Sequence, residues 1–243
     1  MINNKETTII ILAAGKGTRM NSTLPKVLHE LNNKSLIMHV IDCAKKILPK
    51  KIIVIVGYQK DLVINNLRDE SLTFVEQKDQ LGTGHAIKMC LPSLIDFNGN
   101  VLILSGDVPL IKNSTLNSFI NTHNENNCLA SLITTDLINP TGYGRIIKEN
   151  NNFKKIVEEK DTNNTEKKIS EINSGIYIFD SKVLKEKIPL IKSNNAQQEF
   201  YLTDIFNFID KNRISTFKTE DESEISGINT STQLKELENQ CTK

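Results

Sequence analysis

Short apolar runs alternate with amphipathic segments through the first half of this chain. The apolar runs predict strands at residues 8–12, 52–56, 72–75, 101–104 and 129–133. Three of these runs are continuously apolar, which is typical of strands covered on both faces. The segments between the runs repeat apolar residues at helical spacing and predict helices at 36–48, 60–67, 84–91 and 114–123. Repeated strand–helix–strand units predict an α/β fold, with a Rossmann-like, mostly parallel sheet and helices on both faces.

The pattern changes after Pro140. Short strands joined by polar loops are predicted at 145–148, 153–158 and 172–179, with a charged tract at 158–168. We interpret this stretch as a β-rich insertion that lies over one edge of the sheet. Helices are predicted again at 200–210 and 231–240, with a strand at 214–217 between them. Because no internal repeat or long linker appears, we expect a single domain over 1–243, with a first part at about 1–139 and a second at about 140–243.

Composition narrows the classes of partner. The chain has 243 residues, of which 38% are hydrophobic, and this is enough to bury a full core. Thirty Lys and Arg residues stand against 29 Asp and Glu residues, a net charge of +1. A balance this even argues against a nucleic acid or an anionic membrane surface as the partner. Only four of the 30 basic residues are Arg, so an Arg inside a candidate site departs from a strong preference for Lys.

The cysteines and the N-terminus bear on the compartment. The four cysteines are scattered and lack the C-x2-C spacing of a zinc site: Cys43, Cys90, Cys128 and Cys241. We expect free thiols in a reducing compartment. The apolar run at 9–14 is shorter than a signal-peptide core, and no apolar stretch approaches the ~18 residues of a spanning helix. These features predict a soluble cytoplasmic protein.

A glycine-containing loop follows the first predicted strand. It reads L-A-A-G-K-G-T-R-M over residues 12–20, and the carboxyl end of a central strand is where open α/β sheets bind nucleotides. Met20 stands where the dinucleotide fingerprint needs its third glycine, and no glycine precedes Gly15 at P-loop spacing. A plain turn would explain the two glycines alone. It would not explain Arg19 and Lys26, which could place two cations over the same phosphates.

Polar groups also follow the third and fourth predicted strands. Asp107, in L-S-G-D-V-P-L, offers a carboxylate that suits Mg²⁺, although a turn or helix N-cap is the simpler interpretation for an isolated Asp. The segment 77–86 offers carboxamides for a base edge and a Gly-Thr turn into a helix N-terminus, which favours anions. His85 has no carboxylate partner nearby in the sequence, so we expect it to pack or cap. No Ser/His/Asp or Cys/His arrangement is visible.

These segments together resemble a known family. The motifs A-A-G-K-G-T-R-M, L-P-K-V-L-H, Q-L-G-T-G-H-A, G-D-V-P-L, P-T-G-Y-G-R-I and N-N-A-Q are similar to those of the uridylyltransferase domain of N-acetylglucosamine-1-phosphate uridyltransferases. The resemblance extends over residues 8–237. The first motif is shared by many members of the nucleotide-diphospho-sugar transferase superfamily, whereas the third, fifth and sixth are more specific to the N-acetylglucosamine branch. In that superfamily the fold is the α/β sheet predicted above, with a β-rich insertion that binds the sugar.

The resemblance implies a reaction and a set of site residues. The reaction is Mg²⁺-assisted transfer of UMP from UTP to N-acetylglucosamine-1-phosphate, which feeds cell-wall and lipopolysaccharide precursor synthesis. The implied nucleotide-binding residues are Leu12, Ala13, Ala14, Gly15, Lys26, Gln77, Gly82 and Thr83. Arg19 and Lys26 would neutralise the triphosphate, and Asp107 and Asn229 would hold Mg²⁺. Gly144, Glu158 and Asn173 would bind the acetamido sugar, although Glu158 alone would read as a solvated charge in E-E-K-D.

The chain departs from the family pattern in several places. Ser105 stands where many relatives have an aromatic residue, Gln198 replaces a common glycine, and Thr230-Ser231 replaces a common Asn-Arg pair. The hexapeptide-repeat β-helix that carries acetyltransferase activity in relatives does not follow, so we expect no acetyl transfer and a monomer or weak dimer. The alternatives are a glucose-1-phosphate uridylyl- or thymidylyltransferase, a molybdopterin or isoprenoid nucleotidyltransferase, and a catalytically inactive nucleotide-sugar-binding regulator.

Overall fold

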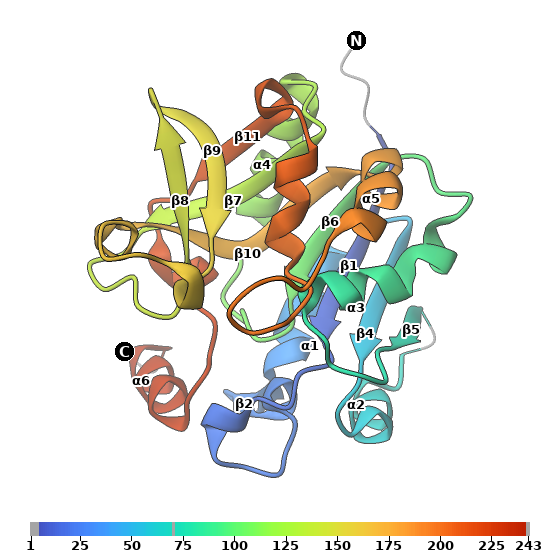
Figure 1. The fold of residues 1–243 in the computed structure, drawn as a ribbon. Coiled ribbons are helices and arrows are strands. Elements are labelled where there is room, and N and C mark those ends of the chain that lie inside the picture. Colours follow the sequence, from blue (N-terminus) through green and yellow to red (C-terminus); the bar gives the residue numbers. More distant parts are fainter. Residues whose placement is uncertain (1–4, 70, 242–243) are drawn as a thin grey trace.

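Nine strands form the main sheet in the computed structural model, which describes residues 5–69 and 71–241 (Figure 1). The main path across the sheet runs β11-β7-β10-β6-β1-β4-β5. Its strands are β1 (Thr7–Ala13), β4 (Lys51–Val56), β5 (Leu72–Glu76), β6 (Asn100–Ser105), β7 (Ala130–Asp136), β10 (Glu171–Asp180) and β11 (Ile214–Lys218). The other two strands, β8 (Gly144–Glu149) and β9 (Asn152–Val157), form a hairpin that joins β10. A separate short hairpin consists of β2 (Glu30–Leu31) and β3 (Lys34–Ser35).

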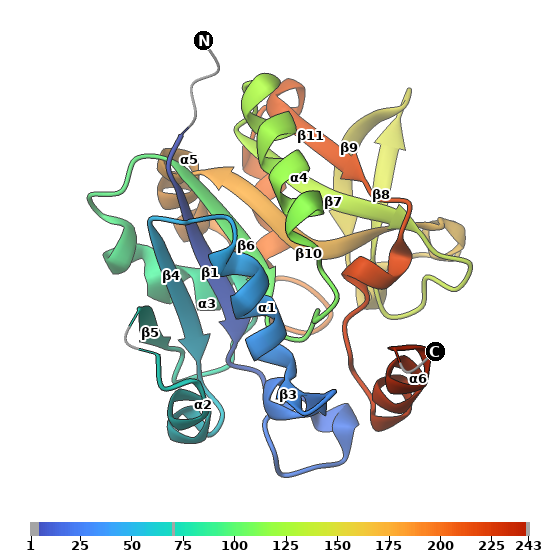
Figure 2. The same cartoon turned by 180° about the vertical axis from the view of Figure 1, so that it is seen from behind.

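Helices cover both faces of the sheet, as the sequence pattern predicted. The α-helices are α1 (Leu36–Lys45), α2 (Lys60–Leu67), α3 (Thr83–Cys90), α4 (Asn113–Glu125), α5 (Ser181–Lys187) and α6 (Ser231–Cys241). Along β1, Ile9 and Ile11 pack into the core that contains α1 and α4, whereas Ile10 packs into the core that contains α3 and α5. Figure 1 shows the face with α3 and α5, and Figure 2 shows α1 and α4 behind it. The continuous apolar run of β1 is therefore buried on both sides.

The parallel part of the sheet agrees with the predicted α/β class. β6, β1, β4 and β5 pair in parallel, and β11 pairs in parallel with β7. The interpretation of 172–179 as part of an insertion over one edge is wrong, because β10 lies inside the sheet, antiparallel to both β6 and β7. A register shift interrupts β10 between Asn173 and Tyr177, at Gly175 with φ of 79°. Only the β8–β9 hairpin extends away from the main path.

The segment predicted as a helix at 200–210 is wound more tightly than an α-helix. The segment Leu202–Phe208 is a 3-10 helix, and its first turn is closed by a hydrogen bond from the Asp204 amide to the Tyr201 carbonyl, three residues earlier. Leu202, Ile205 and Phe206 are nevertheless buried in the same core as α3 and α5. The apolar spacing therefore identified a buried coiled segment correctly, while a tighter turn satisfies the same packing.

Two further observations concern the compartment expected from the sequence. Cys43, Cys90 and Cys128 are free and buried, while the side chain of Cys241 lies outside the described residues. Burial raises the pKa of Cys43 to about 11 and that of Cys90 to about 12, so both are protonated thiols at neutral pH. Within the described ranges, no helix is both long enough and apolar enough to cross a membrane.

Candidate active site

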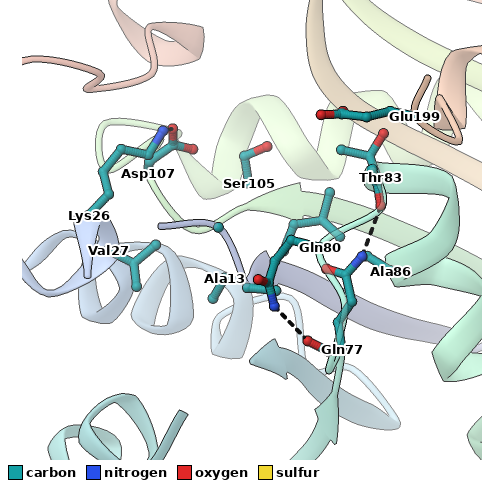
Figure 3. A pocket seen from close by; sticks show the side chains of 14 residues that line it. Ala13, Lys26, Val27, Gln77, Gln80, Thr83, Ala86, Ser105, Asp107 and Glu199 are labelled. Carbon is teal, nitrogen blue, oxygen red and sulfur yellow. Dashed lines mark hydrogen bonds and ion pairs between the residues drawn. The ribbon is translucent and has the colours of Figure 1, made fainter. Parts of the chain in front are cut away.

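A pocket of about 330 Å³ opens at the carboxyl ends of β1 and β6 (Figure 3). Strand order reverses between these two strands, and such a point is where open α/β sheets form ligand crevices. Nine of the residues expected at the site line this pocket: Leu12, Ala13, Ala14, Gly15, Lys26, Gln77, Gly82, Thr83 and Asp107. Sequence reasoning thus predicted the position of the pocket and most of its wall.

The two glycines of the first loop have different roles. A Cβ on Gly15 would meet no atom within 4 Å, so this backbone faces open space at the pocket wall. Gly17 has φ of 67°, and a Cβ there would overlap the Cβ of Lys26. Gly17 therefore supplies a left-handed turn and a close approach that seat Lys26 at the pocket.

Four polar side chains from separate segments meet beside the pocket, and we call this group the phosphate corner: Arg19, Lys26, Asp107 and Asn229. Lys26 Nζ forms an ion pair with Asp107 Oδ2 and donates to Asn229 Oδ1 at 3.0 Å. Arg19 Nη2 donates to the same Asn229 oxygen at 3.0 Å. Two cations and two oxygen ligands are therefore brought together, as expected from the sequence, although Arg19 and Asn229 do not line the pocket itself.

The oxygens of the phosphate corner suit a hard divalent cation. Asp107 supplies a carboxylate and Asn229 a carboxamide oxygen, and both already bind one cation, the ammonium of Lys26. A Cβ on Gly227 would lie 3.3 Å from Asp107 Oδ2, so the glycine leaves space against this carboxylate. No cluster of three or more His, Cys, Asp or Glu side chains suited to a metal occurs among the described residues. One carboxylate with few other protein ligands fits Mg²⁺, which keeps waters and substrate phosphates in its shell.

The backbone around Asn229 is held by a helix cap. Thr230 Oγ1 accepts from the Gln233 amide at 3.2 Å, and Gln233 Oε1 accepts from the amides of Asn229 and Thr230 at 2.8 and 3.0 Å. This reciprocal arrangement is a capping box at the start of α6. The Ile228 amide also donates to the Asp107 carbonyl at 2.9 Å, which ties the loop to the end of β6. Thr230, one of the two residues that depart from the family pattern here, thus takes part in the cap that keeps Asn229 in place.

The opposite wall of the pocket depends on contacts with a distant loop. Buried Gln77 donates from Nε2 to the Gly82 carbonyl at 3.0 Å and contacts His85 Nδ1 at 3.1 Å. Thr83 Oγ1 accepts from the Leu202 amide at 3.0 Å. A Cβ on Gly82 would lie 2.7 Å from the Phe200 carbonyl oxygen. Gly82 and Thr83 therefore dock the segment after residue 198 onto α3.

Gly144, Glu158 and Asn173 form a second group, which we call the insertion pocket after the sugar-binding role that the resemblance implies for it. Gly144 pairs with Asn173 across β8 and β10, and a Cβ on Gly144 would lie 3.3 Å from Glu158 Oε2. The three residues are adjacent, as the resemblance implied, but they do not line the 330 Å³ pocket. The two sites are neighbours, because a Cβ on Gly175 would lie 3.5 Å from Ser105 Oγ in the pocket wall.

The comparison with family models covers the part of the chain that builds the pocket. Residues 9–149 match the model of the MobA-like NTP transferase domain. The chain belongs to this family. The matched range contains the first loop and Asp107, whereas Glu158, Asn173 and Asn229 lie beyond it.

Curated relatives extend the match of this NTP transferase domain to most of the chain. "Bifunctional protein GlmU" of Alkaliphilus oremlandii (strain OhILAs) is 47% identical over 233 residues, which is 94% of this chain and 50% of that protein. The protein of the same name from Nostoc sp. is 45% identical over 227 residues, 93% of this chain and 50% of its own length. The chain spans about half the length of the curated relatives it matches.

Solved structures support the α/β fold of the domain. A UDP-glucose pyrophosphorylase complexed with UDP-glucose superposes with a TM-score of 0.75 at 18% identity, covering 98% of each chain. A Bacillus anthracis protein assigned as a glucose-1-phosphate thymidylyltransferase, in complex with sucrose, gives 0.71 at 22% identity, covering 96% of this chain and 94% of its own. At these identities the likeness concerns the fold alone.

Glu158 of this NTP transferase domain is not the solvated charge that its acidic surroundings suggested. Its Oε1 accepts from Thr203 Oγ1 at 2.8 Å. Burial raises the pKa of the Glu158 carboxyl above its ordinary value; the Thr203 hydrogen bond lowers it, and nearby Asp204 and Asp161 raise it further. Asn173 donates from Nδ2 to the hydroxyl of buried Tyr177 at 2.6 Å. Both polar groups of the insertion pocket are thus fixed by protein partners.

Sequence reasoning did not assign Val27 and Glu199 to the domain's pocket, and it noted Ser105 only as a departure. Gln80 and Ala86 also line the pocket; they lie in the segment 77–86, whose carboxamides were expected to face a base, but were not named as site residues. Gln80 donates from Nε2 to the Gln77 carbonyl at 2.9 Å, so it braces the wall (Figure 3). Glu199 lies two residues after the N-N-A-Q segment, and a Cβ on Gly82 would lie 3.0 Å from the Glu199 Cβ. The docking of this segment onto α3 brings Glu199 to the pocket, and no local sequence signal reports that contact.

Proposed function

We propose that this chain transfers UMP from UTP to N-acetylglucosamine-1-phosphate and so produces UDP-N-acetylglucosamine and pyrophosphate. Membership of an NTP transferase family supports nucleotidyl transfer. Similarity to two proteins named bifunctional GlmU supports the uridylyl branch. The sugar assignment rests on the insertion pocket and on the motifs that the sequence shares with that branch.

One observation carries the proposal: the convergence of the phosphate corner on the edge of the pocket. Lys26 binds both Asp107 and Asn229, which lie 81 and 203 residues further along the chain. A buried-core role would not need these charges, because both Lys26 and Asp107 keep part of their side chains exposed. Two cations beside a glycine loop suit a triphosphate.

The protein residues act by alignment and by neutralising charge. A phosphate monoester is already a nucleophile, so its oxygen can attack the α-phosphorus of UTP in line, without a general base, as the bond to pyrophosphate breaks. This fits the contacts of His85, which are Gln77 and the ring of Phe200 rather than a carboxylate. The planar guanidinium of Arg19 suits bidentate contact with phosphate oxygens, and Lys26 supplies a point charge beside it.

The metal requirement follows from the donor set. Asp107 and Asn229 would hold Mg²⁺, which would screen the repulsion between the two phosphate groups and orient them. Lys26 binds both ligand oxygens in the structure, so its ammonium must yield part of this contact when a metal binds. We expect Lys26 then to turn toward the phosphates.

The remaining parts of the pocket have distinct proposed roles. The carboxamide of Gln77 and the backbone of Leu12 to Gly15 would hold the uracil and ribose. The insertion pocket would hold the acetamido sugar through the Glu158 carboxylate, the Asn173 side chain and the backbone at Gly144. Free thiols at the three described cysteines fit a reducing, cytoplasmic setting.

The test is product analysis with the purified chain. With UTP, N-acetylglucosamine-1-phosphate and Mg²⁺ we expect pyrophosphate and UDP-N-acetylglucosamine. A panel of glucose-1-phosphate, galactose-1-phosphate and dTTP in place of the natural pair measures specificity. Preference for glucose-1-phosphate would replace the sugar assignment, and no pyrophosphate from any pair would contradict nucleotidyl transfer.

A further inference from the structure

Arg145 carries a guanidinium into the interior of the insertion. It is the second residue of β8, its exposed fraction is 1%, and it is the largest of the fully buried side chains described. The chain contains only four Arg residues. Burying a charge is costly unless it is paired, and a packed apolar residue is often at least as stabilising. The placement of Arg145 therefore points to a role beyond filling the core.

The contacts of Arg145 fix two loops against each other. Its Nη1 forms an ion pair with Glu159 Oε2 at 2.8 Å and also donates to the Tyr143 carbonyl. Glu159 Oε2 accepts in addition from the Gly142 amide at 3.2 Å. The Arg145 Nε is buried and has no hydrogen-bond partner in the structure. One nitrogen of the guanidinium thus links the turn before β8 to the turn after β9.

These contacts lie one residue away from each member of the insertion pocket. Arg145 follows Gly144 directly. In the sheet it stands opposite Val157, which precedes Glu158, and opposite Ile172, which precedes Asn173. Glu159, its ion-pair partner, follows Glu158. The guanidinium therefore ties the residue before Gly144, Tyr143, to the residue after Glu158, Glu159.

We propose that Arg145 is a positioning residue for the sugar phosphate. It contacts no substrate, and its pairing with Glu159 holds Gly144, Glu158 and Asn173 at the separation that binds the sugar. This inference rests on the proposed function, because it assigns the insertion pocket to the sugar. An ion pair with a buried guanidinium serves this purpose where a packed apolar pair would be less specific, since its geometry is set by two hydrogen-bonded partners.

The experiment compares Michaelis constants for the two substrates. Arg145→Met keeps the length of the side chain and removes its charge, and Glu159→Gln removes the partner's charge at a side chain that is 27% exposed. We expect KM for the sugar phosphate to rise about tenfold or more in both variants, while KM for UTP stays within about twofold. Arg145→Lys, which restores a cation, should give an intermediate KM for the sugar phosphate.

Arg213→Met is the matched control. Arg213 also anchors a backbone carbonyl, donating from Nε and Nη2 to the Asn127 carbonyl at 3.0 and 2.8 Å, but it lies directly before β11, outside the insertion pocket. We expect this variant to lose thermal stability with both KM values unchanged. Equal rises in both KM values for Arg145→Met, or unchanged KM values with a lower Tm, would make Arg145 merely structural and overturn the proposal.

A variant that fails to fold and a wrong sugar assignment can both be told apart from a failure of this proposal. If Arg145→Met does not fold, Glu159→Gln carries the test alone, and an unchanged KM for the sugar phosphate in that variant overturns the proposal. The wild-type chain is assayed first with the full sugar-phosphate panel, and the variants are measured with the sugar it accepts best. A wild type that accepts a different sugar therefore contradicts the sugar assignment but still tests Arg145. A wild type that accepts none contradicts the proposed function and the inference together.

Discussion

The phosphate corner and the insertion pocket are built in opposite ways. The corner joins side chains from four separate segments through one ion pair, Lys26 to Asp107, and two hydrogen bonds to the Asn229 carboxamide. The insertion pocket places its residues on strands β8 and β10 and in the turn after β9, where sheet pairing sets their spacing. Each of its polar side chains also has a protein partner. The side chains of the phosphate corner can therefore exchange partners when a ligand binds, whereas those of the insertion pocket are held in place before any ligand binds.

This difference predicts different kinetic signatures. Removing charge from the corner should act on the reacting phosphates and lower kcat. Disturbing the insertion pocket should act on one substrate and raise its KM, because groups that bind ground state and transition state equally affect KM alone.

The largest effect is expected at Asp107, the carboxylate of the corner. Asp107→Asn keeps the size of the side chain and removes its charge, so we expect kcat to fall at least about a hundredfold, a loss typical of removing a key electrostatic group. The fold should remain, because the backbone carbonyl of Asp107 still accepts from Ile228. Pyrophosphate release measures kcat, and thermal denaturation shows whether the fold remains. Turnover within tenfold of wild type at saturating Mg²⁺ would exclude Asp107 as the metal ligand.

Arg19 tests whether the corner needs a planar cation or only a positive charge. In Arg19→Lys the charge stays and the bidentate fork is lost, so we expect KM for UTP to rise about tenfold with KM for the sugar phosphate unchanged. Arg68→Lys is the control, since Arg68 is exposed and donates to the nearby Asn65 carbonyl rather than to a residue of the phosphate corner. If the two substitutions have the same effect on KM for UTP, Arg19 contacts no phosphate.

Glu158→Ala tests the other side of the comparison. We expect KM for the sugar phosphate to rise about tenfold while KM for UTP stays nearly constant, because this carboxylate would contact only the sugar. Exposed Glu186→Ala on α5 is the control for loss of a negative charge. Equal rises for the two substrates would show that Glu158 shapes the whole site rather than the insertion pocket.

Glu158→Gln tests the same carboxylate through the thermal stability of the chain and its dependence on pH. The pKa of Glu158 is raised in the folded chain, chiefly by burial, so its ionisation stabilises the unfolded state as pH rises. Wild-type stability should therefore fall as pH rises from below the ordinary carboxyl pKa through the raised one. At neutral pH we expect Glu158→Gln to increase Tm, by about 2–4 °C for each kcal/mol regained, and this advantage should disappear in acid. Thermal denaturation of both proteins from pH 4 to pH 8 measures this difference in Tm. A difference that grows in acid would contradict a raised pKa for Glu158.

The smallest effect is expected at Gln198, outside both sites. This residue has φ of 56°, a left-handed conformation that favours glycine. Gln198→Gly should stabilise the chain by up to about 1 kcal/mol, since relief of strain exceeds the added unfolded-state entropy. Both KM values should stay constant. A destabilised variant in chemical denaturation would mean that the Gln198 side chain contributes contacts worth more than the strain.

The two sites also differ in how far the sequence predicted them. Strand periodicity and the glycine loop placed the pocket, because the ends of parallel strands meet at one edge. The insertion pocket was assigned from the family resemblance, since Glu158 alone resembles a surface charge. The position of β10 was missed although its second half, residues 176–179, is continuously apolar, which is the pattern of a strand buried on both faces. Strand order depends on pairing between distant residues, which local periodicity does not encode.

The position of β10 inside the sheet affects how the chain folds while the ribosome is making it. β6 and β7 are complete by residue 136, yet the strand that joins them spans Glu171–Asp180. During translation the edges of β6 and β7 that pair with β10 stay unpaired while the β8–β9 hairpin is synthesised. Open strand edges invite pairing with other chains. We therefore expect this segment to be the stage at which the nascent chain most needs protection from aggregation, and β10 to close the sheet late in folding.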